Sequence, residues 1–402
     1  MKILVFTSYL TIPKLKGFNK NHSGFGYMVA AITLGIASLS NLKVDVLTQS
    51  NFTDQTTFKK AHFIKRNLMK LLSFFKLSTL IHAFNERNKY HNSDFKRQFI
   101  YGLTSNYFKS IVKHYSAVHI HGISSYTYQA IDYCLKNNIK GIVTIHGINY
   151  LNTSIGISQI QIEKEKEFIQ RITNSKNLKL TVISKGIQSR ITNSLDIKVD
   201  DIYIVPNFHD YNDDYKYETL DIKKKYNLPQ SSEIILSVGN YSENKNQKQL
   251  IDIFELLDKE NCFLLLAGSG LESLLPHIKN LKSKDRIVIC GHVNRNLLPN
   301  YYINSSILAV TSVSEGFGLP MIEAEFYGLP VITFKDIDAV EDILENNNLA
   351  LVSERNSELY KNHLEKGLAK DWDKEMLKKS VEKFEPSIIL NKYKSLLKES
   401  IT

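Results

Sequence analysis

The stretch Ser314–Val331 reads SEGFGLPMIEAEFYGLPV and follows the apolar, β-branched run Ile307–Thr311. A glycine-rich turn between a strand and a helix lets backbone N–H groups approach a phosphate closely, and the helix N-terminus favours the anion. From such a turn Glu315 can point toward a ligand, while Glu323, farther along the helix, can accept hydrogen bonds from ribose hydroxyls. The stretch therefore predicts a pyrophosphate and ribose site. The alternative is a plain tight turn followed by solvated glutamates.

Runs of strand length recur on both sides of this turn, separated by stretches of helical length. The first series comprises Lys2–Phe6, Val44–Leu47, Val118–His121, Ile142–His146, Leu180–Ser184 and Ile202–Val205. The second series comprises Ile234–Val238, Phe263–Ala267, Ile287–Cys290, Ile307–Thr311 and Val331–Phe334. Strands that alternate with helices are typical of parallel, doubly wound sheets, so each series predicts an α/β domain of Rossmann-like form.

The second series starts afresh after a polar, acidic stretch, so we expect two Rossmann-like domains, residues 1–207 and 208–385. The length of 402 residues agrees, because single cores stop growing near ~250 to 300 residues. Ligands of such sheets bind outside the carboxyl ends of the strands, so two domains facing one another would form a cleft. Residues 386–402 carry apolar side chains at helical spacing and predict one amphipathic helix.

The composition bears on the compartment. No apolar run reaches the ~18 to 20 residues that a spanning helix requires, and the opening MKILVFTSYLTIP reads as a first strand rather than a secretory signal. Cys134, Cys262 and Cys290 stand far apart without metal-ligand spacing, so we expect buried apolar side chains in a reducing compartment. These features predict a cytoplasmic protein.

Basic residues concentrate in the first half of the chain. Residues 1–200 carry 27 Lys and Arg against 10 Asp and Glu, a net charge of +17, whereas the remainder carries −7. Such asymmetry favours an anionic partner, either a lipid surface, nucleic acid or a phosphorylated acceptor. No helix-turn-helix, zinc knuckle or aromatic platform indicates nucleic acid, so we expect none.

The segment Lys59–Leu77 reads KKAHFIKRNLMKLLSFFKL and mixes cations with large apolar side chains. As a basic amphipathic helix it would lie on an anionic membrane, with Lys65, Arg66 and Lys70 toward the headgroups. The alternative is a helix that packs its apolar side on the domain. The segment predicts peripheral association with the inner face of the plasma membrane.

Residues 315–332, EGFGLPMIEAEFYGLPVI, resemble the Glu-x7-Glu region of retaining GT-B glycosyltransferases, which build bacterial capsule, lipopolysaccharide and glycolipid sugars. The resemblance continues in order through SGFGY after the first strand, TIHG at 144–147, IVPN at 204–207, VGNYSENKNQ at 238–247 and AGSG at 267–270. It implies a GT-B fold in which the N-terminal domain binds the acceptor and the C-terminal domain binds the nucleotide sugar. It also implies that the last helix returns to the N-terminal domain.

The resemblance assigns roles to individual residues. Glu323 would hold the ribose, Glu315 would lie beside the transferred sugar, and Lys245 would stabilise the leaving diphosphate. His146 would contact the donor sugar or the acceptor, which makes Glu315, His146 and Lys245 the expected catalytic residues. Further donor contacts are expected from Gly26, Asn240, Gly268, Phe317, Gly318 and Leu319. Gly24, placed with Gly26 in the loop after the first strand, would lie on the acceptor side.

One position departs from the family pattern. The family carries an arginine and a lysine near the diphosphate, whereas this chain keeps Lys245 and has Asn240 at the arginine position. Asparagine supplies no charge, so stabilisation of the leaving group would fall on Lys245 and the helix end. Three alternatives are open: the phosphate is bound in a different way, another cation replaces the arginine, or the activity is reduced.

No catalytic metal is expected. Transferases of the other major architecture bind a divalent ion with an Asp-x-Asp pair. The two matches in this chain are Asp336-Ile-Asp338, just after a predicted strand, and Asp371-Trp-Asp373, in a charged helical stretch. Both are predicted to be surface carboxylates.

The resemblance implies transfer of a hexose from a nucleotide-diphosphate sugar, most commonly a UDP-sugar, to a glycan or lipid-linked acceptor with retention of anomeric configuration. This activity would serve the synthesis of cell-surface polysaccharide or glycolipid. Two alternatives stay open. One is a nucleotide-sugar epimerase of the same architecture, and the other is a non-catalytic subunit that binds a sugar nucleotide.

Overall fold

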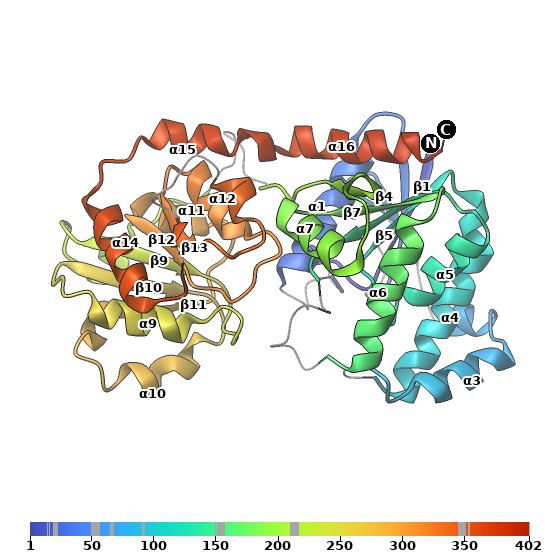
Figure 1. Cartoon of the computed structure of the whole chain (residues 1–402), viewed down its shortest axis with the longest axis horizontal. Coiled ribbons are helices and arrows are strands. Elements are labelled where there is room, and N and C mark those ends of the chain that lie inside the picture. Colours follow the sequence, from blue (N-terminus) through green and yellow to red (C-terminus); the bar gives the residue numbers. More distant parts are fainter. Residues whose placement is uncertain are drawn as a thin grey trace. The chain divides into compact units, whose positions relative to one another are not determined.

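The computed structural model of the chain describes residues 1–13, 15, 17, 18, 23–49, 57–64, 68–90, 93–148, 150, 157–209, 217–344, 351, 352 and 354–401 (Figure 1). It divides into two compact units. The N-terminal unit comprises Met1–Asn207 together with Pro386–Thr402, and the C-terminal unit comprises Phe208–Glu385.

The N-terminal unit is built on an eight-stranded sheet of order β3-β4-β2-β1-β5-β6-β7-β8. Its strands are β1 (Lys2–Thr7), β2 (Lys43–Thr48), β3 (Thr57–Phe58), β4 (Ala61–Phe63), β5 (Ala117–His121), β6 (Gly141–Ile145), β7 (Leu178–Val182) and β8 (Ile202–Ile204). Neighbouring strands pair in parallel except β3 with β4. All residues of β5 and β6 are buried, as expected for strands in the middle of a parallel sheet.

The helices of this unit are α1 (Gly24–Ser38), α2 (Leu68–Leu72), α3 (Leu77–Glu86), α4 (Phe95–Ile111), α5 (Tyr128–Lys136), α6 (Gln159–Thr173), α7 (Lys185–Leu195) and α16 (Pro386–Glu399). Four of them begin at a side chain that accepts the backbone N–H three residues onward, which fixes where the helix starts. These capping residues are Ser23, Asp94, Ser158 and Ser184. Helices α4, α5 and α6 pack on one another in a row (Figure 1).

The C-terminal unit is built on a second parallel sheet, of order β11-β10-β9-β12-β13-β14. Its strands are β9 (Glu233–Val238), β10 (Cys262–Ala267), β11 (Ile287–Gly291), β12 (Ile307–Val310), β13 (Val331–Phe334) and β14 (Leu351–Val352). Its helices are α8 (Ile222–Lys225), α9 (Gln247–Leu256), α10 (Leu275–Ile278), α11 (Leu298–Asn304), α12 (Leu319–Phe326), α13 (Val340–Ile343), α14 (Ser357–Ala369) and α15 (Lys374–Ser380).

The core of the C-terminal unit joins α9 and α14 to one face of this sheet. Gly367 of α14 lies so close to the sheet that a Cβ there would stand 2.8 Å from Ile307 Cδ1. The hydroxyl of buried Tyr360 donates to the Ile332 carbonyl at 2.6 Å and accepts from the Val310 N–H at 2.9 Å. This phenol therefore ties α14 to β12 and β13 at once.

The two parallel sheets confirm the predicted fold class of two Rossmann-like domains. Every predicted strand is present, with ends that differ by at most two residues. The short strands β3, β4 and β14 were not predicted, because two or three residues carry too little periodic signal. Cys134 and Cys262 are buried as expected, whereas Cys290 is only half-buried.

The prediction of one amphipathic helix over Lys59–Leu77 is wrong. Lys59 and Lys60 form a turn with positive φ between β3 and β4, and Ala61–Phe63 pair in parallel with β2. The burial of Ala61 and Phe63 on either side of exposed His62 has the period of a strand. The first helix described after these strands is α2. Lys65 and Arg66 lie outside the described residues.

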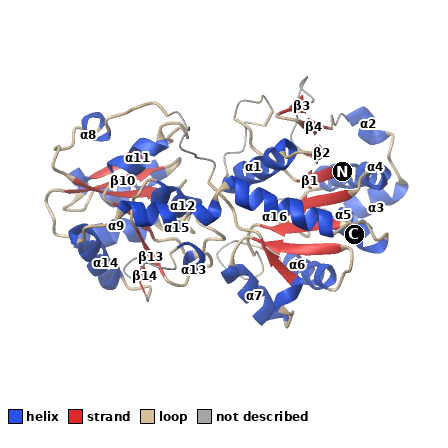
Figure 2. Ribbon diagram, turned by 90° about the horizontal axis from the view of Figure 1, so that it is seen from above, coloured by secondary structure: helices blue, strands red, loops and turns tan. Residues whose placement is uncertain are grey.

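The last helix, α16, packs on α1 and β6 of the N-terminal unit, and Figure 2 shows α1 and α16 side by side. Gly35 of α1 makes room for Leu390, because a Cβ there would stand 2.6 Å from its methyl groups. The buried face of α16 also holds Tyr393 and Leu397, whereas Ile388 points outward and is 42% exposed. Among the helices that the structure describes, none has the length and apolar composition to cross a bilayer.

Replacing Leu397 by alanine should destabilise the N-terminal unit by about 2–5 kcal/mol, because it opens a cavity where α16 packs. The same change at exposed Ile388, on the same helix, should cost less than about 0.5 kcal/mol. Urea unfolding followed by far-UV circular dichroism measures both. Equal destabilisation by the two variants would contradict this packing.

Candidate active site

The carboxyl ends of β9, β10 and β12 lie at one edge of the C-terminal sheet, because these strands run in parallel. The loops that follow them are bonded to each other. Asn244 Nδ2 donates to the Ser314 carbonyl at 2.7 Å, and the Val313 N–H donates to the Asn244 carbonyl at 2.7 Å. The predicted phosphate turn is thereby anchored to a loop that lies some 70 residues earlier in the sequence.

Two of the predicted catalytic residues meet in this place. Lys245, in the loop after β9, forms an ion pair with Glu315, in the loop after β12. The same carboxylate oxygen of Glu315 accepts from the Ser312 hydroxyl at 2.7 Å. Both side chains are partly buried, 27% exposed for Lys245 and 13% for Glu315. The arrangement holds a cation and a carboxylate at the edge of the sheet with little water around them.

Gly318 ends this loop and starts α12. Its φ of 78° lies in the left-handed region, which a residue with a side chain adopts only at a cost. Leu319 is the first residue of the helix, and Pro320 follows within its first turn. Phe317 is buried with its ring edge-on to Phe384 at 5.4 Å, so its side chain faces the protein and not a ligand. Phe317 therefore offers a ligand only its backbone.

Glu323 is buried on α12, 3% exposed, and both of its oxygens are engaged. Oε1 accepts from Arg295 Nη2 at 3.1 Å, and Oε2 accepts from the Tyr302 hydroxyl at 2.8 Å. These two partners orient the carboxylate. Neither Arg295 nor Tyr302 was predicted from the sequence. The only signal for Arg295 was a cation in the loop after β11, at the same edge of the sheet.

Asn240, at the expected arginine position, holds two loops together. Its Oδ1 accepts from the Ser269 N–H at 3.0 Å, and its backbone carbonyl accepts from Gln247 Nε2 at 3.2 Å. Gly268 beside it has no room for a side chain, because a Cβ there would overlap the Gly239 carbonyl. Asn240 and Gly268 therefore set how closely the loops after β9 and β10 approach.

A second group of predicted residues gathers in the N-terminal unit. Gly24 and Gly26 lie in the first turn of α1 and not in the preceding loop as predicted, because Ser23 caps the helix by accepting the Gly26 N–H at 3.1 Å. A Cβ at Gly26 would overlap the Thr11 hydroxyl, so this glycine is required by packing. At Gly24 none of the residues that the structure describes lies within 4 Å of the corresponding position.

His146, the predicted histidine, directly follows β6 and meets the α1 turn. The ring of Phe25 stands edge-on to its imidazole, with ring centroids 5.1 Å apart. His146 Nε2 shares a hydrogen bond of 3.0 Å with Nδ1 of His121, the last residue of β5. In a pair of neutral imidazoles one nitrogen must donate here and the other accept, so His121 fixes the orientation of the His146 ring.

Three histidines cluster here, since His119 stands beside His121 with ring centroids 3.9 Å apart. His119 and His121 are buried, whereas His146 is half-buried. Burial lowers the pKa of His146 to about 4 and of His119 to about 3, and it lowers the pKa of His121 well below its usual range. All three are therefore neutral at pH 7. The His146 imidazole therefore brings no positive charge to this edge of the sheet.

The two Asp-x-Asp matches have local partners. Asp336 accepts from Arg355 Nε at 2.7 Å, and Asp373 caps α15 by accepting the Met376 N–H at 3.0 Å. Lys70, the predicted membrane-side residue that the structure describes, lies on α2 with its ammonium 4.8 Å from the ring centroid of Tyr107.

The fold and the C-terminal site define the class of protein. Residues 218–384, nearly the whole C-terminal unit, match the family model described as glycosyl transferases group 1. The solved structures with this fold span both units, so the predicted GT-B fold and the resemblance to glycosyltransferases are confirmed.

Individual relatives are distant. The chain is 26% identical to the amylovoran biosynthesis glycosyltransferase AmsD of Erwinia amylovora over 54% of this chain and 62% of that protein. It shares its fold with sucrose-phosphate synthase of Thermosynechococcus elongatus, with TM-score 0.72, 17% identity and 99% coverage of both chains. It also resembles Anabaena Alr3699/HepE in complex with UDP and glucose, with TM-score 0.67, 14% identity, and 99% and 100% coverage. The chain spans 40% to 62% of the first three relatives that it matches in sequence.

The buried histidines predict that acid destabilises the N-terminal unit. Their folded pKa values lie below the ordinary 6.5, so between pH 6.5 and about 4 the unfolded chain binds protons that the folded chain does not. The free energy of unfolding therefore decreases as the pH is lowered, by about 2 kcal/mol per histidine from pH 7 to 5. Urea unfolding of the wild type at both pH values measures the fall.

The variant His119→Gln should lose about a third of this pH dependence, because one of the three groups is gone. Exposed His114 provides the matched variant His114→Gln, which should keep the wild-type dependence. A pH dependence that is identical in the wild type and His119→Gln would contradict the assignment.

Proposed function

We propose that this chain transfers a hexose from a nucleotide-diphosphate sugar, with UDP as the carrier, to a glycan or lipid-linked acceptor with retention of anomeric configuration. The observation that carries the proposal is the Lys245–Glu315 ion pair beside the left-handed Gly318 turn, with Glu323 held on the same helix. It is supported by a relative named for amylovoran biosynthesis and by a structural neighbour in complex with UDP and glucose. The setting is the synthesis of cell-surface polysaccharide or glycolipid.

The donor would lie at the edge of the C-terminal sheet. Lys245 would neutralise charge that develops on the leaving diphosphate, with the N-terminus of α12 as the second positive group. Glu315, tied to Lys245, would face the transferred sugar, and Glu323 would accept from the ribose hydroxyls. These groups supply the stabilisation that a divalent ion supplies elsewhere, so we propose no metal.

The acceptor would bind to the N-terminal unit near Gly24 and His146. Among the described residues none lies within 4 Å of the Cβ position at Gly24, so there is room for a hydroxyl-bearing ligand near the neutral ring of His146. Because His146 is a weak base, we propose that the departing phosphate takes the acceptor proton and that attack occurs on the face that the phosphate leaves. This route accounts for retention without a covalent intermediate.

Asn240 is the one feature that favours a non-catalytic subunit over an enzyme. Its hydrogen bond to Ser269 gives this asparagine a structural reason that is independent of activity. Arg295 brings a different cation to the loop after β11, beside Glu323. We therefore favour an enzyme with a different grip on the donor.

The reaction is tested by incubating the protein with UDP-sugars and an acceptor, and by determining the anomeric configuration of the product by NMR. An α-linked donor should give an α-linked product, whereas a β-linked product contradicts retention. Lys245→Ala should lower turnover at least ~100-fold, since it removes a charge from the leaving group, while Lys248→Ala, at an exposed position three residues away, should not. Isomerisation of the sugar with donor alone would instead indicate the epimerase.

The ribose contact is tested by Glu323→Gln, which preserves shape and removes the charge. UDP affinity, measured by isothermal titration calorimetry, should fall about 10- to 100-fold, as for loss of a hydrogen bond to a charged group. Glu325→Gln is the matched control, because Glu325 is equally buried on α12 but bonds to the Ser380 hydroxyl. Equal losses in both variants would mean that the effect is structural.

A further inference from the structure

Helix α3 turns its large apolar side chains toward water. Leu77, Ile81 and Phe84 recur at helical spacing and are 69%, 56% and 57% exposed. The opposite face, which is buried, carries Thr79, Ala83 and Glu86. A helix of a water-soluble domain buries its apolar stripe, so this helix has the reverse arrangement. Its outward face needs a partner of its own.

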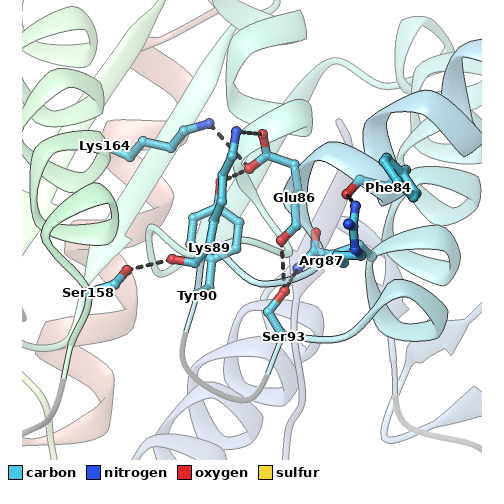
Figure 3. Close-up of polar contacts among 9 residues, drawn as sticks. Phe84, Glu86, Arg87, Lys89, Tyr90, Ser93, Ser158 and Lys164 are labelled. Atoms are coloured by element: carbon cyan, nitrogen blue, oxygen red, sulfur yellow. Dashed lines mark hydrogen bonds and ion pairs between the residues drawn. The ribbon is translucent and has the colours of Figure 1, made fainter.

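Two sets of contacts fix α3 in this orientation. On α4, Gly102 admits Thr79 so closely that a Cβ there would stand 2.6 Å from its methyl group, and Asn106 Nδ2 donates to the Thr79 hydroxyl at 3.0 Å. At the other end of α3, the Glu86 carboxylate accepts from Tyr90 and from Lys89 Nζ, the latter at 3.0 Å (Figure 3). Rotating α3 to bury its apolar stripe would break the contacts of Thr79 with α4 and separate Glu86 from Lys164 of α6, whose ammonium lies 3.9 Å from its carboxylate.

A hollow of about 400 Å³ opens where α3 ends against the start of α6. It is lined by residues that include Phe84, Arg87, Asn88, Lys89, Ser158 and Ile160. The Arg87 guanidinium lies over the Phe84 ring at 3.6 Å and donates to the Phe84 carbonyl, as Figure 3 shows. The exposed apolar residues of α3 therefore adjoin a hollow that is lined by guanidinium, ammonium and amide donors.

The surroundings are basic. Residues 68–97 carry Lys70, Lys76, Arg87, Lys89, Lys96 and Arg97 against Glu86 and Asp94, a net charge of +4. Burial lowers the pKa of His82 on α3, and nearby Lys164, Lys109 and Lys89 lower it further. The apolar exposure also continues onto α2, where Leu68 and Met69 are 58% and 78% exposed. Apolar side chains ringed by cations match the boundary between acyl chains and anionic headgroups.

We propose that α2, α3 and this hollow form a docking surface for an anionic membrane. Leu77, Ile81 and Phe84 enter the acyl boundary, and the hollow takes a phosphate-bearing lipid headgroup beside Arg87. A second copy of the chain fits less well, because a symmetric contact would set this basic surface against itself. The surface replaces the Lys59–Leu77 helix predicted from the sequence, and its role is independent of glycosyl transfer.

Co-sedimentation of the full chain with vesicles tests the proposal without a turnover assay. Phosphatidylcholine vesicles containing about 30 mol% phosphatidylglycerol should bind the wild type at least ~10-fold better than phosphatidylcholine alone. The triple variant Leu77→Ser, Ile81→Ser, Phe84→Ser should lose at least ~10-fold of that binding. Its matched control is a second triple variant with serine at the similarly exposed Val199, Leu256 and Ile303, which should bind as the wild type.

The hollow is tested separately by Arg87→Gln, with Arg190→Gln as the control at another half-buried arginine. The first should weaken vesicle binding about threefold or more, and the second should not. Inorganic phosphate and chloride at equal ionic strength should release the wild type equally if the hollow takes a headgroup within the bilayer. Stronger release by phosphate would indicate a site for free phosphate and contradict the proposal.

Two further results would overturn it. One is wild-type binding by the triple variant at Leu77, Ile81 and Phe84, with circular dichroism confirming that it is folded. The other is concentration-dependent dimerisation of the wild type that this variant abolishes, which size-exclusion chromatography with light scattering would reveal. A protein that binds vesicles but transfers no sugar would leave this surface in place and contradict only the proposed function.

Discussion

Parallel pairing of the strands is the constraint on which the C-terminal site depends. Because β9, β10 and β12 run in one direction, their following loops must end at one edge of the sheet, whatever their separation in sequence. Gly268 then lets the loops after β9 and β10 come so close that a side chain at this position would overlap the Gly239 carbonyl. Lys245 and Glu315 can form an ion pair only because this convergence brings them together.

The polar side chains of the site also support one another. Glu323 is buried with an arginine and a tyrosine on its two oxygens, and burial of a carboxylate without such partners would cost several kcal/mol. In the N-terminal unit the corresponding solution is neutrality, since burial keeps His121 and His146 uncharged and one hydrogen bond orients both. The two units therefore present different chemistry, a charged pair at the edge of one sheet and neutral imidazoles at the edge of the other.

The same contrast between buried polar and exposed apolar groups governs α3. Its buried face carries Glu86, which accepts hydrogen bonds from Tyr90 and Lys89, and its large apolar side chains are left on the exposed face. The spacing of apolar residues shows that such a helix is amphipathic but does not show which of its faces packs on the domain. The helix would look the same in sequence if Leu77 and Ile81 formed part of a core.

The sequence by itself determined the two parallel sheets, the boundaries of their strands, and the turn around Gly318, because strand-length apolar runs and glycine act locally. It did not determine that Lys59 and Lys60 form a strand turn, since a short basic and apolar segment suits a helix equally well. Nor did it indicate Arg295 beside Glu323, His121 beside His146, or the structural bond of Asn240 to Ser269. These contacts join residues far apart in the chain, so only the tertiary structure decides them.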